Sequence, residues 1–190
     1  RDLITAKFAL NEGGGGVLAE GRVPIYNGIQ AGEKTYQNYR LEVVNPGGHS
    51  SRPRADNAIY QLNDALRRVS GYEFPIEFND TTRGFFRQMS KMESGQLSRD
   101  MLAILETPPN KSALQRIQQD PGHNSILHTT CVTTMMDAGH APNALPQRAT
   151  ANVNCRIFPG RSQEEIRQVL ETIVDDVEAV SYTHLRAHET

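Results

Sequence analysis

The chain has 190 residues and a formal net charge of −2, from 20 lysine and arginine and 22 aspartate and glutamate residues. This length, with 37% hydrophobic residues, is enough for a hydrophobic core in one large domain or in one and a half small ones. Because like charges form no block, we expect neither a nucleic acid nor an anionic membrane among its partners. The apolar runs are only a few residues long, too short for a membrane-spanning helix.

The N-terminal part of the sequence predicts short strands. Residues 3–10 are mostly apolar and are followed by Asn11, Glu12 and four glycines, and residues 23–30 and 35–44 are also rich in strand-forming residues. A phosphate-binding loop is disfavoured, because neither Gly-Lys-Ser/Thr nor a helix follows the glycines. Glu12 could instead offer its carboxylate to a divalent metal ion, or it could be an ordinary surface residue.

A histidine lies on a glycine-containing turn after the strand at 35–44. The sequence NPGGHSSRP, residues 45–53, joins this strand to a helical pattern at 56–69. Two glycines allow unusual backbone angles and the close approach of another surface. His49 could act there as a donor, acceptor, acid or ligand, although a lone loop histidine often only stabilises its turn.

The middle of the chain predicts a helix and then an insertion. Apolar residues recur at helical spacing in the segment 56–69, where they form one buried stripe: Ala58, Ile59, Leu62, Ala65, Leu66 and Val69. Residues 71–122 are polar and contain four prolines. We expect this segment to be an insertion within the domain, with one or two helices, at 98–105 and 112–119.

Two more strands are predicted, at residues 125–136 and 147–158. The second alternates cleanly, with an apolar face made of Ala149, Ala151, Val153, Cys155 and Ile157. Cys131 and Cys155 lie in these two strands, outside any metal-binding or redox spacing. We expect two buried free thiols rather than a disulfide.

The C-terminal region predicts one helix and then a segment of a different kind. Ser162 and Glu165 have the spacing of a capping box, and the helix after them has an apolar stripe from Ile166 to Val177. The last ten residues, 181–190, lack strand alternation and resemble a translated sequencing adapter. We expect them to be non-native and not to form the final strand. His184 and His188 have metal-ligand spacing, but no glutamate follows His184 as a metalloprotease helix requires.

The order of elements from residue 35 onward predicts the fold class. Strand, helix, strand, strand and helix form a ferredoxin-like βαββα(β) arrangement, an antiparallel sheet of the α/β (α+β) class. Each helix has one apolar stripe, so we expect both helices to cover the same face of the sheet. The other face would meet solvent or a partner.

Two further residues are candidates for binding. Arg156 lies on the polar face of the strand at 147–158, where its guanidinium could grip a carboxylate or form a cross-strand ion pair. Asn143, after Pro142, could face a ligand or stabilise its own turn. A serine nucleophile at Ser50 is disfavoured, because the sequence has no Gly-x-Ser-x-Gly elbow.

Four short motifs, in order, resemble those of the M20 family of metallopeptidases. They are ALNEGG at 9–14, GGHSSRP at 47–53, PNALP at 142–146 and NCR at 154–156. The family includes bacterial carboxypeptidases and dipeptidases, carnosinases, aminoacylases and succinyl-diaminopimelate desuccinylase. The resemblance extends over residues 3–180.

The resemblance implies a domain organisation and partners. Family members have an α/β catalytic domain with two zinc ions, interrupted by a ferredoxin-like lid that usually forms a homodimer. Residues 1–34 would then be a remnant of the first half of the catalytic domain. Residues 35–180 would be the lid, with the insertion at 71–122, and residues 181–190 the tail.

The resemblance also implies roles for single residues. Glu12 matches a ligand of one zinc ion, and His49 matches the lid histidine that reaches the partner subunit's site and donates to the developing oxyanion. Asn143 matches an asparagine near the substrate's carbonyl or carboxylate, and Arg156 matches an arginine that grips the substrate carboxylate.

The expected function is a fragment of a di-zinc metallohydrolase that cleaves the amide bond of a peptide or an N-acyl amino acid. The family's His-x-Asp pair, bridging aspartate, glutamate base and C-terminal histidine have no counterpart here. We therefore expect the chain as it stands to be inactive and not to bind zinc fully. The alternative is a free-standing ferredoxin-like module that binds a small ligand or dimerises.

Overall fold

The computed structural model describes residues 14–18, 20–22, 24–174 and 181–184. The chain divides into two compact units, Arg1–Glu33 and Lys34–Thr190. In the first unit, β1 (Gly14–Leu18) and β2 (Pro24–Ile29) form an antiparallel hairpin around a 3-10 turn at Glu20–Arg22. The strand predicted at 23–30 is confirmed. The strand predicted at 3–10, and Glu12, lie outside the described residues.

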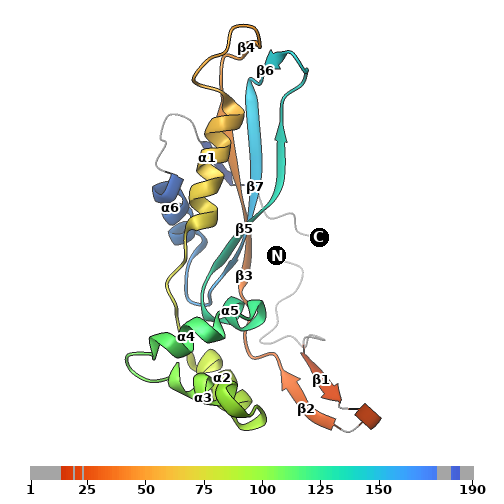
Figure 1. Cartoon of the computed structure of the whole chain (residues 1–190), viewed down its shortest axis with the longest axis vertical. Coiled ribbons are helices and arrows are strands. Elements are labelled where there is room, and N and C mark those ends of the chain that lie inside the picture. Colours follow the sequence, from red (N-terminus) through yellow and green to blue (C-terminus); the bar gives the residue numbers. More distant parts are fainter. Residues whose placement is uncertain (1–13, 19, 23, 175–180, 185–190) are drawn as a thin grey trace, which may run out of the picture. The chain divides into compact units, whose positions relative to one another are not determined.

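The second unit contains a four-stranded antiparallel sheet (Figure 1). Its strands in the order β5-β7-β3-β8 are Thr130–Ala138, Arg148–Ile157, Thr35–Val44 and Ser181–His184. The two central strands pair along their whole length, from Thr35 opposite Ile157 to Val44 opposite Arg148. The predicted alternation is confirmed, because the five apolar residues of β7 are buried and their neighbours are not.

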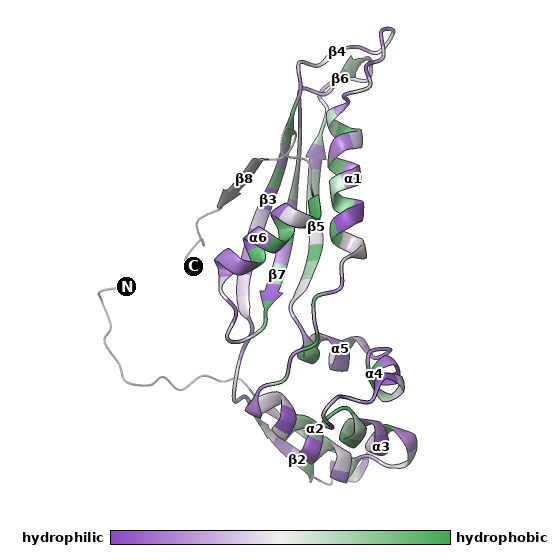
Figure 2. Ribbon diagram, turned by 90° about the vertical axis from the view of Figure 1, so that its left-hand side faces the viewer, coloured by the Kyte–Doolittle hydropathy of each residue, from purple (hydrophilic) through white to green (hydrophobic). Residues whose placement is uncertain are grey.

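Two helices cover one face of this sheet, α1 (Ala58–Gly71) and α6 (Gln163–Val174) (Figure 2). Asn57 caps the start of α1 by accepting a hydrogen bond from the Ile59 amide. The predicted capping box of α6 is confirmed, since Ser162 and Glu165 exchange side-chain-to-backbone hydrogen bonds. The apolar stripes of both helices and the inward residues of β3 and β7 form one hydrophobic core.

Three helices lie within the insertion at 71–122 and a fourth begins at its end, where one or two were predicted. They are α2 (Asp80–Met92), α3 (Gly95–Ala103), α4 (Lys111–Ile117) and α5 (Pro121–Leu127). They have their own core around Phe86, Met101 and Leu127. The strand predicted from residue 125 begins at Thr130, because Asp120 caps α5 and Pro121 occupies its first turn.

The expectation of free thiols is wrong, because Cys131 and Cys155 form a disulfide. The two residues lie directly opposite each other on β5 and β7, with Cα atoms 4.1 Å apart. Strand register decides which residues face each other, and the sequence of either strand alone does not specify it.

The expectation that the C-terminal segment forms no strand is also wrong, for residues 181–184. Ser181–His184 forms β8, which pairs with β3 from Glu42 to Tyr39. An edge strand offers unpaired backbone groups, and pairing with them does not require side-chain alternation. His184 is therefore in a strand and not in the helix that the metal-ligand spacing would need. His188 lies outside the described residues.

Candidate functional site

The turn that carries His49 is held by a short two-stranded ribbon, β4 (Gly48–His49) with β6 (Ala144–Leu145). Gly47 has a φ of 72°, and a Cβ there would lie 2.6 Å from Cγ of Gln147. Glycine is needed at this position for both reasons, as the sequence predicted. The ribbon is the tip of the domain, beyond the end of the sheet where Val44 pairs with Arg148 (Figure 1).

The His49 side chain is exposed, and one of its two ring nitrogens is engaged. Nδ1 accepts a hydrogen bond from the Ser51 backbone amide at 3.2 Å and lies 2.8 Å from the Ser51 hydroxyl. Because a backbone amide can only donate, Nδ1 is an acceptor and the neutral ring carries its proton on Nε2. The tip therefore presents an imidazole N–H donor directed away from its own turn.

Asn143 lies beside His49. Its carbonyl oxygen accepts a hydrogen bond from the Ser50 amide at 3.0 Å, and the next residue, Ala144, pairs with His49. Within the described part of the chain, the Asn143 side-chain amide has no hydrogen-bond partner. The structure thus brings together two residues that are 94 positions apart in the sequence.

Arg156 lies at the opposite end of the sheet. It lies eight positions along β7 from Arg148, about 26 Å at roughly 3.3 Å per residue. Its guanidinium carbon lies 4.8 Å from the ring centroid of Tyr36, its direct neighbour on β3. Among the described residues Arg156 has no ion pair, so the cross-strand ion pair considered from the sequence is not what holds it.

Lys34, which sequence reasoning missed, also lies at this end, the base of the sheet. Its Nζ donates to the Ser125 carbonyl at 2.7 Å and to the Thr130 hydroxyl at 3.2 Å. Burial, and then the positive charge of Arg156, lower the pKa of Lys34 to about 8. Burial, and then the charge of Lys34, also lower the pKa of His128.

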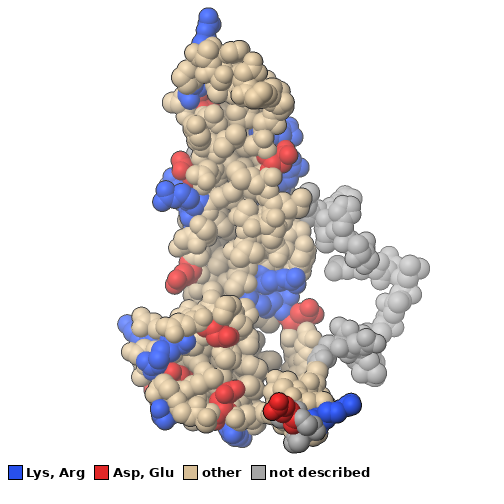
Figure 3. Space-filling view, turned by 45° about the vertical axis from the view of Figure 1, so that its right-hand side comes forward, with Lys and Arg blue, Asp and Glu red and all other residues tan. Residues whose placement is uncertain are grey.

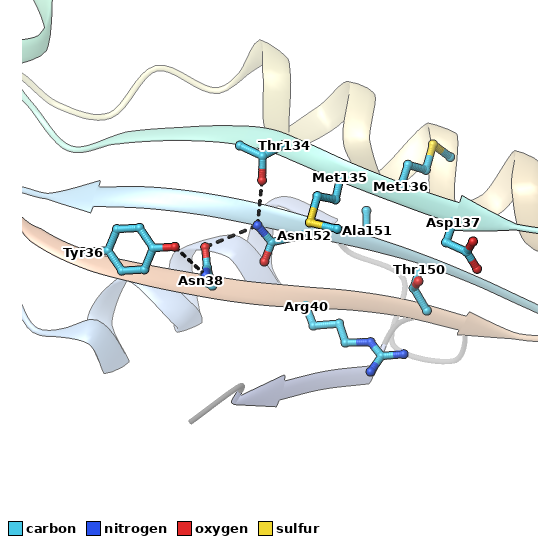
Figure 4. A pocket seen from close by; sticks show the side chains of 10 residues that line it. All are labelled: Tyr36, Asn38, Arg40, Thr134, Met135, Met136, Asp137, Thr150, Ala151 and Asn152. Carbon is cyan, nitrogen blue, oxygen red and sulfur yellow. Dashed lines mark hydrogen bonds between the residues drawn. The ribbon is translucent and has the colours of Figure 1, made fainter. Parts of the chain in front are cut away.

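A shallow hollow of about 500 Å³ lies between tip and base on the face of the sheet that the helices leave open (Figure 4). Side chains of three strands line it, and hydrogen bonds join several of them. Asn152 donates to the Thr134 hydroxyl at 2.7 Å and to Asn38 at 3.3 Å, and Asn38 donates to the Tyr36 hydroxyl at 2.7 Å. Only the alternation of the strand at 147–158 indicated this polar face.

Charged side chains lie in small groups on the one face of the molecule that Figure 3 shows. On the face shown in Figure 3, basic and acidic side chains alternate without a continuous area of one sign.

Within the described ranges, no set of three or more His, Cys, Asp or Glu residues could hold a metal ion. Glu12, the zinc ligand that the resemblance implies, lies outside the described residues. No described helix is long and apolar enough to cross a membrane.

The chain is similar to several hydrolases. It is 29% identical to the N-fatty-acyl-amino acid synthase/hydrolase of Homo sapiens, over 91% of this chain and 35% of that protein. It is 29% identical to the probable carboxypeptidase S-like 2 of Dictyostelium discoideum, over 76% of this chain and 27% of that protein. The chain thus spans about a third of the length of these curated relatives.

Solved structures and a family model also match. A dipeptidase from Saccharomyces cerevisiae aligns with a TM-score of 0.49 at 9% identity, over 80% of this chain and 37% of that one. An M20 family metallo-carboxypeptidase from Sulfolobus solfataricus aligns with a TM-score of 0.47 at 17% identity, over 75% and 40%. The model of the peptidase dimerisation domain matches residues 31–180. The chain therefore belongs to the M20 peptidase dimerisation domain family.

Proposed function

We propose that this chain is the lid of a metallohydrolase that cleaves the amide bond of a peptide or an N-acyl amino acid. The family membership and the names of the similar hydrolases support the reaction class. The observation that carries the proposal is the exposed His49 ring, whose Nδ1 is engaged by Ser51. A fixed N–H donor at a tip suits stabilisation of the oxyanion that forms when an amide carbonyl is attacked.

The proposal includes a division of the chain. Residues 1–34 are the end of the first half of a catalytic domain, residues 35–180 are the lid with its insertion at 71–122, and residues 181–190 are a non-native tail. The lid is ferredoxin-like, which the strand order β5-β7-β3-β8 and the two helices on one face support. Glu12 binds one of two zinc ions, whose other ligands belong to a longer protein, so the chain alone is inactive.

His49 serves the active site of a partner subunit in this proposal. Arg156 grips the substrate carboxylate, but it lies about 26 Å along β7 from the end near the tip. A single substrate cannot touch both residues of one chain at that distance. Two subunits related by a two-fold axis can bring the tip of one to the base of the other.

The edge strand β5 is the surface that we propose for this homodimer. Val132, Met135 and Met136 on this strand are between 50% and 71% exposed. Its outer backbone groups have no strand partner among the described residues. An apolar edge of this kind favours pairing with another strand, and a second copy of β5 offers the same groups in return.

Two substitutions in the longer protein test the proposed function. His49→Ala should lower kcat roughly 100-fold or more and leave KM and the metal content nearly unchanged, because the lost donor acts on the transition state. Glu12→Ala should lower the metal content by about one ion per chain. The exposed His140 provides a control, because His140→Ala should leave all three quantities unchanged.

The oxyanion role of His49 would be wrong if His49→Ala kept the wild-type kcat. If purified protein with intact zinc failed to hydrolyse any peptide or N-acyl amino acid, the reaction class itself would be wrong. A module that only binds a ligand or dimerises would then be the better account.

A further inference from the structure

We propose that Lys34 and Arg156 together form a two-cation site for the carboxylate group of the substrate. The inference rests on the proposed function, because it adds a second residue to the contact assigned there to Arg156. It concerns the base of the sheet, on the open face, and the ligand class is an amino acid or N-acyl amino acid with a free α-carboxylate.

The positions of the residues follow from strand register. Arg156 on β7 lies directly between Tyr36 on β3 and Thr130 on β5. Lys34 lies just before β3, and its contact with the Thr130 hydroxyl at 3.2 Å places its ammonium group on the same face as Arg156. The Lys34 ammonium crosses the end of β7 to reach the Thr130 hydroxyl. One row across the sheet therefore contains the polar groups of Lys34, Arg156 and Thr130.

The charges in this row are not balanced. Neither Lys34 nor Arg156 has an acidic partner within the described ranges. Lys34 is half-buried, and burial together with the nearby Arg156 lowers its pKa to about 8. Two like charges at a partly desolvated position raise the free energy of the protein unless an anion joins them. The imbalance favours an anionic ligand.

The row also has hydrogen-bond donors to spare. A lysine ammonium has three N–H groups, and Lys34 uses two of them, for Ser125 and Thr130. The Thr130 hydroxyl accepts from Lys34, so its own proton is available. Arg156 rests on the Tyr36 ring, which leaves the edge of its guanidinium, with paired N–H groups, available for a carboxylate.

A purely structural role for Lys34 is the alternative. Its bond to the Ser125 carbonyl holds the last turn of α5, where a positive charge is favourable. Lys34→Gln tests the charge, because glutamine keeps an N–H donor at this position but carries no charge. Lys34→Arg keeps the charge.

The test uses the full chain with lysine labelled at the ε carbon, since only four lysines give signals. NMR titrations with N-acetyl-L-leucine and with the neutral N-acetyl-L-leucinamide compare a carboxylate with its amide. The carboxylate should shift the Lys34 signal and raise its pKa from about 8 toward the ordinary value, because an anion stabilises the protonated amine. The amide should do neither.

Variants complete the test. We expect Lys34→Gln and Arg156→Gln each to weaken binding of N-acetyl-L-leucine roughly fivefold to tenfold, and Lys34→Arg to stay within about twofold of wild type. Lys111→Gln on α4 is the matched control and should bind as wild type does.

Each contrary result has a distinct meaning. If Lys34→Gln binds like wild type while Arg156→Gln does not, Lys34 only holds α5; the site proposal fails and the proposed function stands. If the chain binds the carboxylate and the amide equally, or binds neither, the carboxylate roles of both residues are wrong.

Discussion

The two ends of the sheet hold their polar side chains in opposite ways. At the tip, His49 is exposed, and hydrogen bonds to its own turn orient it. At the base, Lys34 is half-buried next to Arg156, and burial and like charge both disfavour its protonated form. A residue that reaches into another subunit needs exposure and orientation, whereas a residue that binds an anion gains from unbalanced charge.

The largest stability effect is expected near the base, at the disulfide between β5 and β7. Cys131 and Cys155 close a loop with a sequence separation of 24, which constrains the unfolded chain by about 3 kcal/mol. The double variant Cys131→Ala with Cys155→Ala should lose about that much free energy of unfolding, measured in urea. Reduction of the wild type should give a similar loss, and an unchanged urea midpoint in both cases would contradict the disulfide.

A smaller effect is expected at the tip. Gly47→Ala should lower the free energy of unfolding by about 2 kcal/mol, because alanine is strained at positive φ and its Cβ would clash with Gln147. Gly160→Ala is the matched control, since Gly160 has a φ of 100° and nothing within 4 Å of the added Cβ. Gly160→Ala should lower the free energy of unfolding by only about 1 kcal/mol. Equal losses in the two variants would mean that the close approach to Gln147 does not matter.

The smallest effect is a pH dependence at the base. Lys34 has a folded-state pKa of about 8, below its unfolded value. Above pH 8 the folded protein therefore binds fewer protons than the unfolded chain does. The resulting penalty is complete below pH 8 and fades as pH rises toward 10.4. The measurement compares the free energy of unfolding of the wild type with that of Lys34→Met. The difference, wild type minus variant, should rise by about 1 kcal/mol between pH 7.5 and pH 10. This value is reduced for solvent screening, because Lys34 is only half-buried. A constant difference would contradict the low pKa.

The sequence predicted the parts of the fold that depend on local periodicity. Strand β7 alternates between apolar and polar residues, and Ser162 with Glu165 caps α6 as expected. Helix α2 was missed, because Gly84 and several polar residues obscure its apolar stripe, although Asn79 caps it. Strand β8 was missed because the free edge of β3, and not alternation within residues 181–184, decides its pairing.

The site was predicted motif by motif, but not as an arrangement. His49 and Asn143 were separate candidates, and only the pairing of β4 with β6 brings them together. The disulfide was missed for the same reason, since register is a property of two strands. A single lysine before a strand has no recognisable motif, so Lys34 became a candidate only through its position beside Arg156.

Mixing of two inactive subunits tests the central claim, that His49 completes the site of a partner subunit. His49→Ala and Arg156→Ala are each expected to inactivate the longer protein. In a mixed dimer, one site would combine an intact Arg156 with an intact His49 from the other chain. Equal mixing, with half of the dimers mixed, should restore about a quarter of the wild-type rate. No activity in the mixture, with mixed dimers present, would mean that His49 does not act across the interface.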